Sequence, residues 1–428
     1  MEYKLIIRGK RNMKMELKYG KSKLYFEIDS KNHLGTLLPN EKENGLRGKD
    51  EVRRALENPI GTKRLREIVS KGEKVAIVTS DITRPMPSKT VLPVVLEELK
   101  SAGIEEEDIT VVFALGSHRG HSEEEKRMLA GDEIFESGVK LIDSDPDDCV
   151  NLGVCSNRTP VDIFKPVANA DRIVCLGNIE YHYFAGYSGG AKALMPGVSS
   201  RRAIQINHSN MVMEEARAGN METNPVRQDI DETGSHIKID FIVNVVLNSK
   251  KEITSAVAGD CIKAHRAGCK TLDAMYGVKI KEKADIVIVS PGGYPKDINL
   301  YQAQKGLDNA KHAVKDGGIV ILAASAKEGF GEKTFEEWMK NMTPDEMICE
   351  IRENFKLGGH KAAAIAMILK KSKIYMVSDL DGDIVRKINF EPFETVQKAL
   401  DAAKKELGED SGILVLPLAG STLPICGD

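Results

Sequence analysis

From Lys71 onward the chain alternates short apolar runs with amphipathic segments, and this alternation constrains the fold more than any other feature. The apolar runs are rich in β-branched residues, which is typical of buried strands: VAIVTS, ITVVFALG, RIVCLGN and DFIVNVVLN. Between them lie helical patterns such as TVLPVVLEELKSAG. Strands that alternate with helices indicate βαβ units around a mostly parallel sheet, so we predict an α/β fold.

The chain is long enough for more than one such sheet, because its 428 residues exceed the roughly 100–200 residues of an ordinary domain. Before the alternation, KLIIRG and the pair MKMELKYG and KSKLYFEI predict strands, the last two as an antiparallel hairpin. A helix ending near Gly277 and the charged segment VKIKEKAD mark a domain boundary, after which IVIVS, IVILAAS and KIYMVSD are further strands. One long helical stretch is expected from about Pro344 to Ser372. The final run, ILVLPLAG, can complete the second sheet or cross back to the first, and periodicity leaves both open.

We therefore predict two α/β domains, each a mixed, largely parallel sheet with flanking helices: residues 1–277 and residues 278–411, with 412–428 to be assigned to either. A net charge of −3 favours neither nucleic acid nor a membrane surface as a partner. The seven cysteines include no CxxC pair, which argues against a disulfide framework or a zinc knuckle. No stretch of about 18 apolar residues occurs, so we expect a cytoplasmic protein.

Four polar segments follow apolar runs, where open α/β sheets bind their ligands. They are SDITRP, GSHRGH, EYHYFAGYSGGAKALMPG and DINLYQAQK. Arg84 in the first suits a carboxylate or phosphate, although an Asp81–Arg84 salt bridge explains the same residues equally well. His118 in the second is able to transfer protons near neutrality, although a lone histidine is more often structural. His121 is expected to be exposed at the start of a helix.

The third segment holds His182, a glycine-rich run at 186–190 and Lys192, and His208 follows at the end of a predicted helix. The order of residues is not that of a Walker A loop, and a glycine run alone is more often a turn than a site. In the fourth, Gln302 and Lys305 share one helix face near its positive N-terminus, although a solvated face is the commoner explanation. Together these residues predict an interdomain cleft that binds an anion and transfers protons.

The motifs SDxTRP, GxHR, HYFAGxSGGxK, a later histidine and YQxxK occur in this order between Ser80 and Lys305. In this combination they resemble the nickel-pincer lactate racemase family, and the surrounding βα pattern extends the resemblance over most of the chain. The resemblance implies a nickel cofactor built on pyridinium-3,5-bisthiocarboxylic acid mononucleotide. It also implies that residues 412–428 return to the first domain.

Carried over by position, the resemblance implies that Lys192 is linked to a thiocarboxyl group of the cofactor and that His208 is the protein ligand of nickel. His118 and His182 become the acid and base, one for each enantiomer, while the hydrogen on Cα moves as hydride. The implied contacts to the substrate carboxylate come from Arg84, Gln302, Lys305 and the adjacent Tyr301. The implied contacts to the cofactor come from Asp81, Thr83, Ser188, Gly189 and Gly190.

The family contains racemases and epimerases of several 2-hydroxy acids, so lactate is the default substrate and malate, longer aliphatic acids and sugar acids stay open. Cofactor-making enzymes are the implied partners. Two other functions fit the same residues. One is a zinc hydrolase with His118, His182 and His208 on one zinc ion, and the other is a non-catalytic protein that closes on an organic anion.

Overall fold

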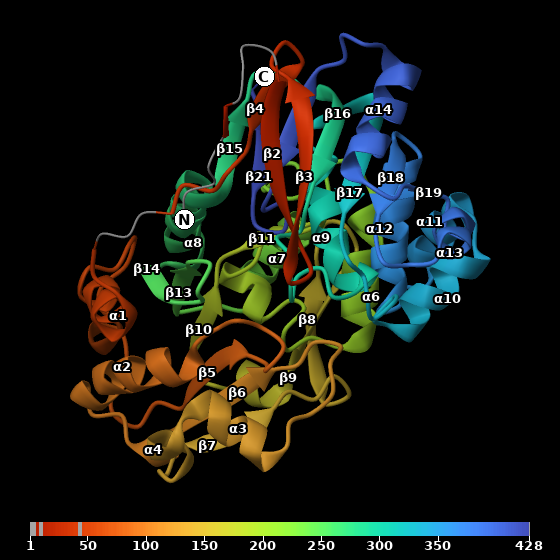
Figure 1. The fold of residues 1–428 in the computed structure, drawn as a ribbon. Coiled ribbons are helices and arrows are strands. Elements are labelled where there is room, and N and C mark those ends of the chain that lie inside the picture. Colours follow the sequence, from red (N-terminus) through yellow and green to blue (C-terminus); the bar gives the residue numbers. More distant parts are fainter. Residues whose placement is uncertain (1–5, 8–11, 42–44, 428) are drawn as a thin grey trace. The chain divides into compact units, whose positions relative to one another are not determined.

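The computed structural model describes residues 6–7, 12–41 and 45–427, and the chain divides into two compact units. The central unit is Glu41–Ala274, and the terminal unit joins Met1–Asn40 to Met275–Asp428. Each unit is built on its own six-stranded sheet with flanking helices, which confirms the predicted fold class (Figure 1). Among the described residues, every helix is too short or too polar to span a bilayer.

The sheet of the central unit has five parallel strands and one antiparallel edge strand. In spatial order the strands are β14 (Ile253–Gly259), β13 (Phe241–Leu247), β10 (Arg172–Asn178), β5 (Val75–Ser80), β6 (Ile109–Ala114) and β7 (Lys140–Asp143). Two hairpins accompany it, β8 (Cys149–Val154) with β9 (Pro160–Phe164) and β11 (Tyr181–His182) with β12 (Gly186–Tyr187). The helices are α1 (Gly48–Glu57), α2 (Ser88–Ser101), α3 (Glu123–Ala130), α4 (Asp132–Phe135), α5 (Lys165–Ala168), α6 (Arg201–Ser209), α7 (Pro225–His236) and α8 (Cys261–Tyr276).

Burial explains why the inner strands are apolar along their whole length. Ile77, Val111 and Val174, on three neighbouring strands, have no exposed surface, and β5 is buried at five successive positions. A parallel strand with helices on both faces has no solvent side, so it shows no alternation of polar residues. Helix α3 begins at a capping box, in which Ser122 accepts the Glu125 N–H and the Glu125 side chain accepts the Ser122 N–H.

The terminal unit has a six-stranded parallel sheet in the order β19 (Glu391–Pro392), β18 (Lys373–Val377), β17 (Val314–Ala323), β16 (Ala284–Val289), β20 (Ile413–Leu416) and β4 (His33–Thr36). Smaller sheets are β1 (Ile6–Ile7), β2 (Asn12–Tyr19) and β3 (Ser22–Asp29), and the parallel pair β15 (Gly277–Ile280) and β21 (Leu423–Cys426). The helices are α9 (Leu300–Ala310), α10 (Lys333–Asn341), α11 (Pro344–Glu353), α12 (Gly359–Leu369), α13 (Gly382–Lys387) and α14 (Val396–Leu407).

The described start of the chain belongs to the terminal unit, which differs from the predicted domain of residues 1–277. Leu17 and Phe26 of the β2–β3 hairpin pack into one core with Ile286 of β16 and Leu400 of α14, and β4 pairs with β20. The hairpin itself is confirmed, with Tyr19 opposite Ser22. KLIIRG lies largely outside the described residues. Hydrophobic periodicity marks a strand but not its partner, so the predicted domain of residues 1–277 followed the order of the chain and not the pairing of its strands.

Three further expectations differ from the structure. The run ILVLPLAG forms β20 inside the second sheet, and β21 pairs with β15, so residues 413–426 remain in the terminal unit. The segment VKIKEKAD is not a linker, because its start forms β15. The helical stretch near 344–372 is two helices, because Gly358 between them has a φ of +88°, which ends the helical geometry.

Candidate active site

The expected catalytic segments of the central unit follow three strands that lie side by side. β10, β5 and β6 are adjacent and parallel, so their carboxyl ends meet at one edge of the sheet. Asp81 follows β5, His118 follows β6, and His182 lies in the hairpin after β10. From β5 the chain continues to β6 and β7 on one side of β5, and it then returns to form β10 and β13 on the other side of β5. Such a switch in strand order is where open α/β sheets bind ligands.

Asp81 and His118 form a carboxylate–histidine pair. Asp81 is buried, and His118 Nδ1 lies 2.5 Å from Asp81 Oδ2. Thr83 Oγ1 donates to the other carboxylate oxygen at 2.8 Å. Burial raises the pKa of Asp81, but the hydrogen bond and charge of His118 outweigh it, so that the net pKa shift is downward. Because the ionised carboxylate accepts the Nδ1 proton, the neutral ring keeps its lone pair on Nε2, where a general base needs it.

This pairing changes two sequence interpretations. The alternative of an Asp81–Arg84 salt bridge is wrong, because both Asp81 oxygens are taken by His118 and Thr83, and no such ion pair occurs among the described residues. Asp81 and Thr83 were matched to the cofactor, but their side chains are engaged with each other and with the imidazole of His118. Arg84 is exposed on the same loop and is held there by a backbone hydrogen bond to Asp81.

His182 is held in the opposite tautomer. The N–H of Ala185 donates to His182 Nδ1 at 3.2 Å across the β11–β12 turn, so the proton of the neutral ring lies on Nε2. The ring stacks with Tyr183 and meets Phe184 edge to face, with ring centroids 4.5 Å apart. His118 and His182 therefore present complementary Nε2 atoms, one as an acceptor and one as a donor.

His208 contacts the same phenylalanine. It is buried in the last turn of α6, and its ring centroid is 4.9 Å from that of Phe184. Asn207 Nδ2 donates to the Val226 carbonyl, which leaves Asn207 Oδ1 to accept from His208 Nδ1 at 3.0 Å. This bond orients the ring and places its lone pair on Nε2, the form of histidine that binds a metal. Asn207 was not predicted from the sequence.

Lys192 lies on the 3₁₀ turn η3 (Gly190–Ala193), which packs beside β5, β10 and α7. Burial, followed by the positive charges of Arg84 and Arg227, lowers the pKa of Lys192 to about 7. About half of the Lys192 side chains would then be neutral amines near neutrality, whereas an ordinary lysine is almost wholly protonated. A neutral amine is the nucleophilic form that a covalent link to a carboxyl-type carbon requires.

The glycine-rich run before Lys192 is bound to the protein interior. Gly190 N–H donates to Asn244 Oδ1 at 2.8 Å, and Ser188 Oγ donates to the Asn178 carbonyl at 2.7 Å. Gly189 has a φ of +82°, and a Cβ there would lie 2.7 Å from Asn244 Oδ1. The Gly190 amide and the Ser188 hydroxyl, both expected at the cofactor, are therefore occupied by internal hydrogen bonds.

A buried charged cluster under this run was missed by the sequence analysis. Arg227 of α7 is fully buried and donates to the Tyr187 and Gly189 carbonyls and, at 2.7 Å, to Asp231. His265 of α8 donates from Nε2 to the Ser188 carbonyl at 2.8 Å and accepts from Arg266 on Nδ1. The cluster therefore fixes the backbone that carries Lys192. The sequence held one sign of polar contacts in this region. Asn244 lies inside the apolar run FIVNVVL, and a buried amide needs a hydrogen-bond partner.

His121 is a structural residue, and the expectation that it is exposed was wrong. Its side chain is 1% exposed, its Nδ1 lies 2.6 Å from Asp143 Oδ1, and its Nε2 accepts the Ile82 N–H. The zinc-hydrolase alternative is also wrong for this structure. Among the described residues, the side chains close enough to share one ion are Cys155, Glu232 and His236, and the three expected histidines form no such group.

The remaining expected residues lie on α9 of the terminal unit. Asn299 caps this helix by accepting the Gln302 N–H, and the side chains of Gln302 and Lys305 are exposed on one face of its first turns. Tyr301 is half-buried, meets Phe335 edge to face, and its carbonyl accepts from Lys361. Gln302 and Lys305 therefore lie at the end of α9 where the helix dipole is positive.

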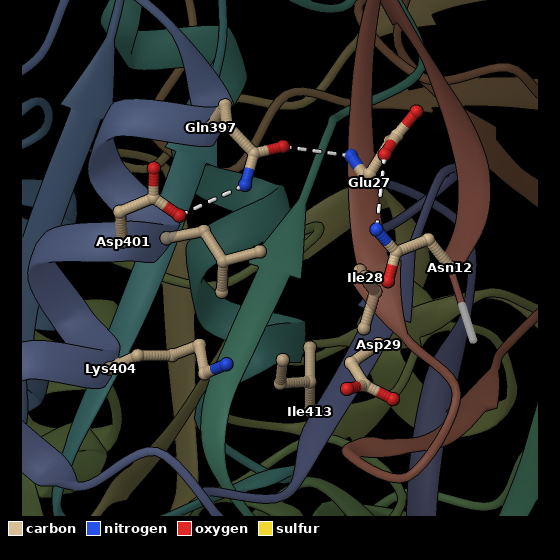
Figure 2. A pocket seen from close by; sticks show the side chains of 9 residues that line it. Asn12, Glu27, Ile28, Asp29, Gln397, Asp401, Lys404 and Ile413 are labelled. Carbon is tan, nitrogen blue, oxygen red and sulfur yellow. Dashed lines mark hydrogen bonds between the residues drawn. The ribbon is translucent and has the colours of Figure 1, made fainter.

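A cavity of about 520 Å³ in the terminal unit contains none of the expected residues. It is lined by Asn12, Glu27, Ile28, Asp29, Gln397, Leu400, Asp401, Lys404 and Ile413. Figure 2 shows Gln397 spanning it, with hydrogen bonds to the Glu27 backbone at 2.8 Å and to Asp401 at 3.0 Å. Its three carboxylates make it a poor site for an anionic substrate.

Comparison with known proteins agrees with this arrangement. The model of the lactate racemase N-terminal domain matches residues 19–220, and that of the lactate racemase C-terminal domain matches residues 279–422. A lactate racemase of Thermoanaerobacterium thermosaccharolyticum is 35% identical, covering 94% of this chain and 97% of the relative, and one of Lactiplantibacillus plantarum is 32% identical over the same shares.

Solved structures extend the comparison to the fold. The lactate racemase apoprotein from T. thermosaccharolyticum superimposes with a TM-score of 0.85 over 96% of this chain and all of that chain. A Thermotoga maritima protein, 19% identical over 90% of this chain and all of that chain, has a TM-score of 0.63 and shares the fold alone. The matched domains, the two relatives and the three strand-end loops lead to one conclusion: the chain belongs to the lactate racemase family.

Proposed function

We propose that this protein racemises a small 2-hydroxy acid, with lactate as the first candidate, by using His118 and His182 as a general base and a general acid. The observation that carries the proposal is their position on loops at one edge of the sheet, together with the carboxylate that orients His118 as a base. His118 is oriented by Asp81 with its lone pair on Nε2, and His182 is oriented by Ala185 with its proton on Nε2. Membership of the lactate racemase family supports the same chemistry.

The two histidines move the hydroxyl proton. His118 removes it from one enantiomer, and the negative charge of Asp81 stabilises the imidazolium that forms. Loss of the Cα hydrogen as hydride, which the bound cofactor would accept, would convert the deprotonated substrate into a planar 2-keto acid. After the carbonyl has turned its other face and the hydride has returned to it, a doubly protonated His182 would donate a proton to the oxygen and be left neutral. The opposite enantiomer uses the same residues in reverse order, which explains why two histidines are needed.

The residues fit a nickel pincer nucleotide, which when bound supplies the acceptor and donor of the Cα hydride. Lys192, with its lowered pKa, is the proposed attachment point, and His208, oriented by Asn207, is the proposed nickel ligand. If the cofactor supplies three of the four ligand atoms of nickel, the protein needs to supply only one. Enzymes that make and load this cofactor are therefore proposed partners.

Arg84 is the proposed clamp for the substrate carboxylate, because it is exposed on the loop that carries Asp81 and its planar fork matches a carboxylate. Tyr301, Gln302 and Lys305 at the start of α9 are also proposed to bind the substrate carboxylate. The proposal rests on their family positions and on the exposed side chains of Gln302 and Lys305 near the positive end of the helix.

The test is a chiral assay of protein co-produced with cofactor-making enzymes, on a panel of 2-hydroxy acids that includes lactate and malate. His118→Asn and His182→Asn should each slow racemisation in both directions by roughly 10²–10⁴-fold, the usual contribution of a general acid or base. His33→Asn, on β4 of the terminal unit, is the matched control and should keep wild-type turnover. Loaded protein that racemises no 2-hydroxy acid, or a His118→Asn variant of undiminished rate, would refute the proposal.

A further inference from the structure

One face of α7 lies against the turn of the β8–β9 hairpin, away from the residues assigned above. Glu232 accepts the Ser156 N–H at 3.0 Å, and Thr159 donates to Asp229. Cys155 is buried at the start of the same turn, with its thiol 3.6 Å from the Asp229 carbonyl. Glu232 and His236 are four residues apart on the helix, so their side chains project from the same face.

Three different metal-binding groups converge at this contact. Cys155 Sγ, a Glu232 carboxylate oxygen and a His236 ring nitrogen all lie within 4.8 Å of one another. Thiolate, imidazole and carboxylate are the donors that Zn²⁺ uses in proteins, at about 2.0–2.3 Å. The ligand atoms of a tetrahedral ion with such bonds lie roughly 3.3–3.8 Å apart. Side-chain rotations that bring the three atoms about 1 Å closer together would therefore complete the site.

The hairpin backbone independently makes room for the histidine ring. Gly153, two residues before Cys155, has a φ of +138°, and a Cβ there would lie 2.6 Å from His236 Nδ1 and 2.8 Å from Cε1. Only glycine allows the strand to approach the imidazole this closely. The ring nitrogen is thereby held beside the strand that leads directly to the thiol.

We propose that Cys155, Glu232 and His236 bind one Zn²⁺ ion, with a water molecule as fourth ligand, and that the ion ties the β8–β9 hairpin to α7. Binding forms a zinc–sulfur bond and releases the thiol proton of Cys155 to solvent. The site differs from the proposed nickel site in residues and in chemistry, since the latter has no cysteine ligand. The ion is structural in role: it stabilises the helix whose Arg227 bonds to the carbonyls of Tyr187 and Gly189.

The test uses Co²⁺ as a spectroscopic substitute on the full-length, chelator-treated protein made without the cofactor pathway. Wild-type protein should bind one Co²⁺ with a thiolate-to-cobalt charge-transfer band in the near ultraviolet, and Zn²⁺ should displace it. Cys155→Ser should abolish the band, and His236→Gln should weaken binding by at least about 10–100-fold, the loss known even for outer-sphere partners of a metal. Cys149→Ser, at the start of the strand that precedes Cys155, should behave as wild type.

A stability measurement guards against misfolded variants. Zn²⁺ should raise the melting midpoint of wild-type and Cys149→Ser protein, and should leave that of His236→Gln unchanged at the same concentration. A wild-type protein without the charge-transfer band would overturn the proposal. So would a band that persists in folded Cys155→Ser protein, since the thiolate would then come from another cysteine.

Discussion

Lys192 should titrate far below an ordinary lysine in the cofactor-free protein, and this can be measured directly. Burial and the charges of Arg84 and Arg227 lower its pKa from 10.5 to about 7. At about pH 8 a group of pKa 7 is roughly 90% neutral, whereas one of pKa 10.5 is roughly 0.3% neutral, a difference of about 300-fold in reactive amine. A neutral amine is the form that the proposed covalent attachment of a cofactor would require.

Trace acetylation over a pH series, with each lysine quantified by mass spectrometry, is the assay. Burial lowers the absolute acetylation rate of a lysine, so the quantity compared is the shape of each lysine's rate-against-pH curve. The exposed Lys250 serves as the internal reference. Arg84→Met removes one neighbouring charge and should raise the pKa of Lys192 only in part, since burial is the larger cause. Arg352→Met, an exposed arginine on α11, should leave the profile unchanged.

The same shift predicts a pH-dependent stability. Below about pH 7 both folded and unfolded chains carry the Lys192 ammonium, and the folded chain bears its full desolvation cost. Between about pH 7 and 10.5 the unfolded chain binds more protons, so stability rises with pH. Lowering the pKa from 10.5 to about 7 corresponds to roughly 5 kcal/mol, and solvent around the half-buried side chain reduces this cost to about 2–4 kcal/mol.

Lys192→Met should therefore raise the free energy of unfolding of the apoprotein by about 2–4 kcal/mol near pH 6 and by much less near pH 10. Urea unfolding at several pH values measures this. A Lys192 that acetylates with the same pH profile as Lys250, together with a Met variant whose effect does not depend on pH, would refute the reasoning.

Three other outcomes are expected. Asp81→Asn should leave the fold intact by circular dichroism but lower turnover in the chiral assay by roughly 10²–10⁴-fold, because His118 loses the carboxylate that sets its tautomer. Gly189→Ala should cost about 1–3 kcal/mol in urea unfolding, since its φ is +82° and its Cβ would crowd Asn244, whereas Gly234→Ala, with open space inside α7, should stabilise by about 0.5–1 kcal/mol. Protein made without the cofactor-making enzymes should melt cooperatively in calorimetry yet racemise nothing when nickel alone is added.

The positions of the central residues were predictable from the sequence because they depend on local pattern. Buried parallel strands are continuous apolar runs, and the polar residues that follow them must lie at the carboxyl edge of the sheet. Asp81, His118 and His182 were placed there from the runs alone. Their order and spacing also carried the family resemblance, which the domain matches confirm.

Only the tertiary structure decided which groups pair and which strands join. Asp81 and His118 are 37 residues apart, and Arg227 reaches the run before Lys192 across a similar distance. The β2–β3 hairpin and β20 lie in one unit although almost the whole chain separates them. The periodicity of apolar residues indicates which positions are buried. Hydrogen-bond and strand partners depend on packing between distant segments, and the local sequence pattern does not encode them.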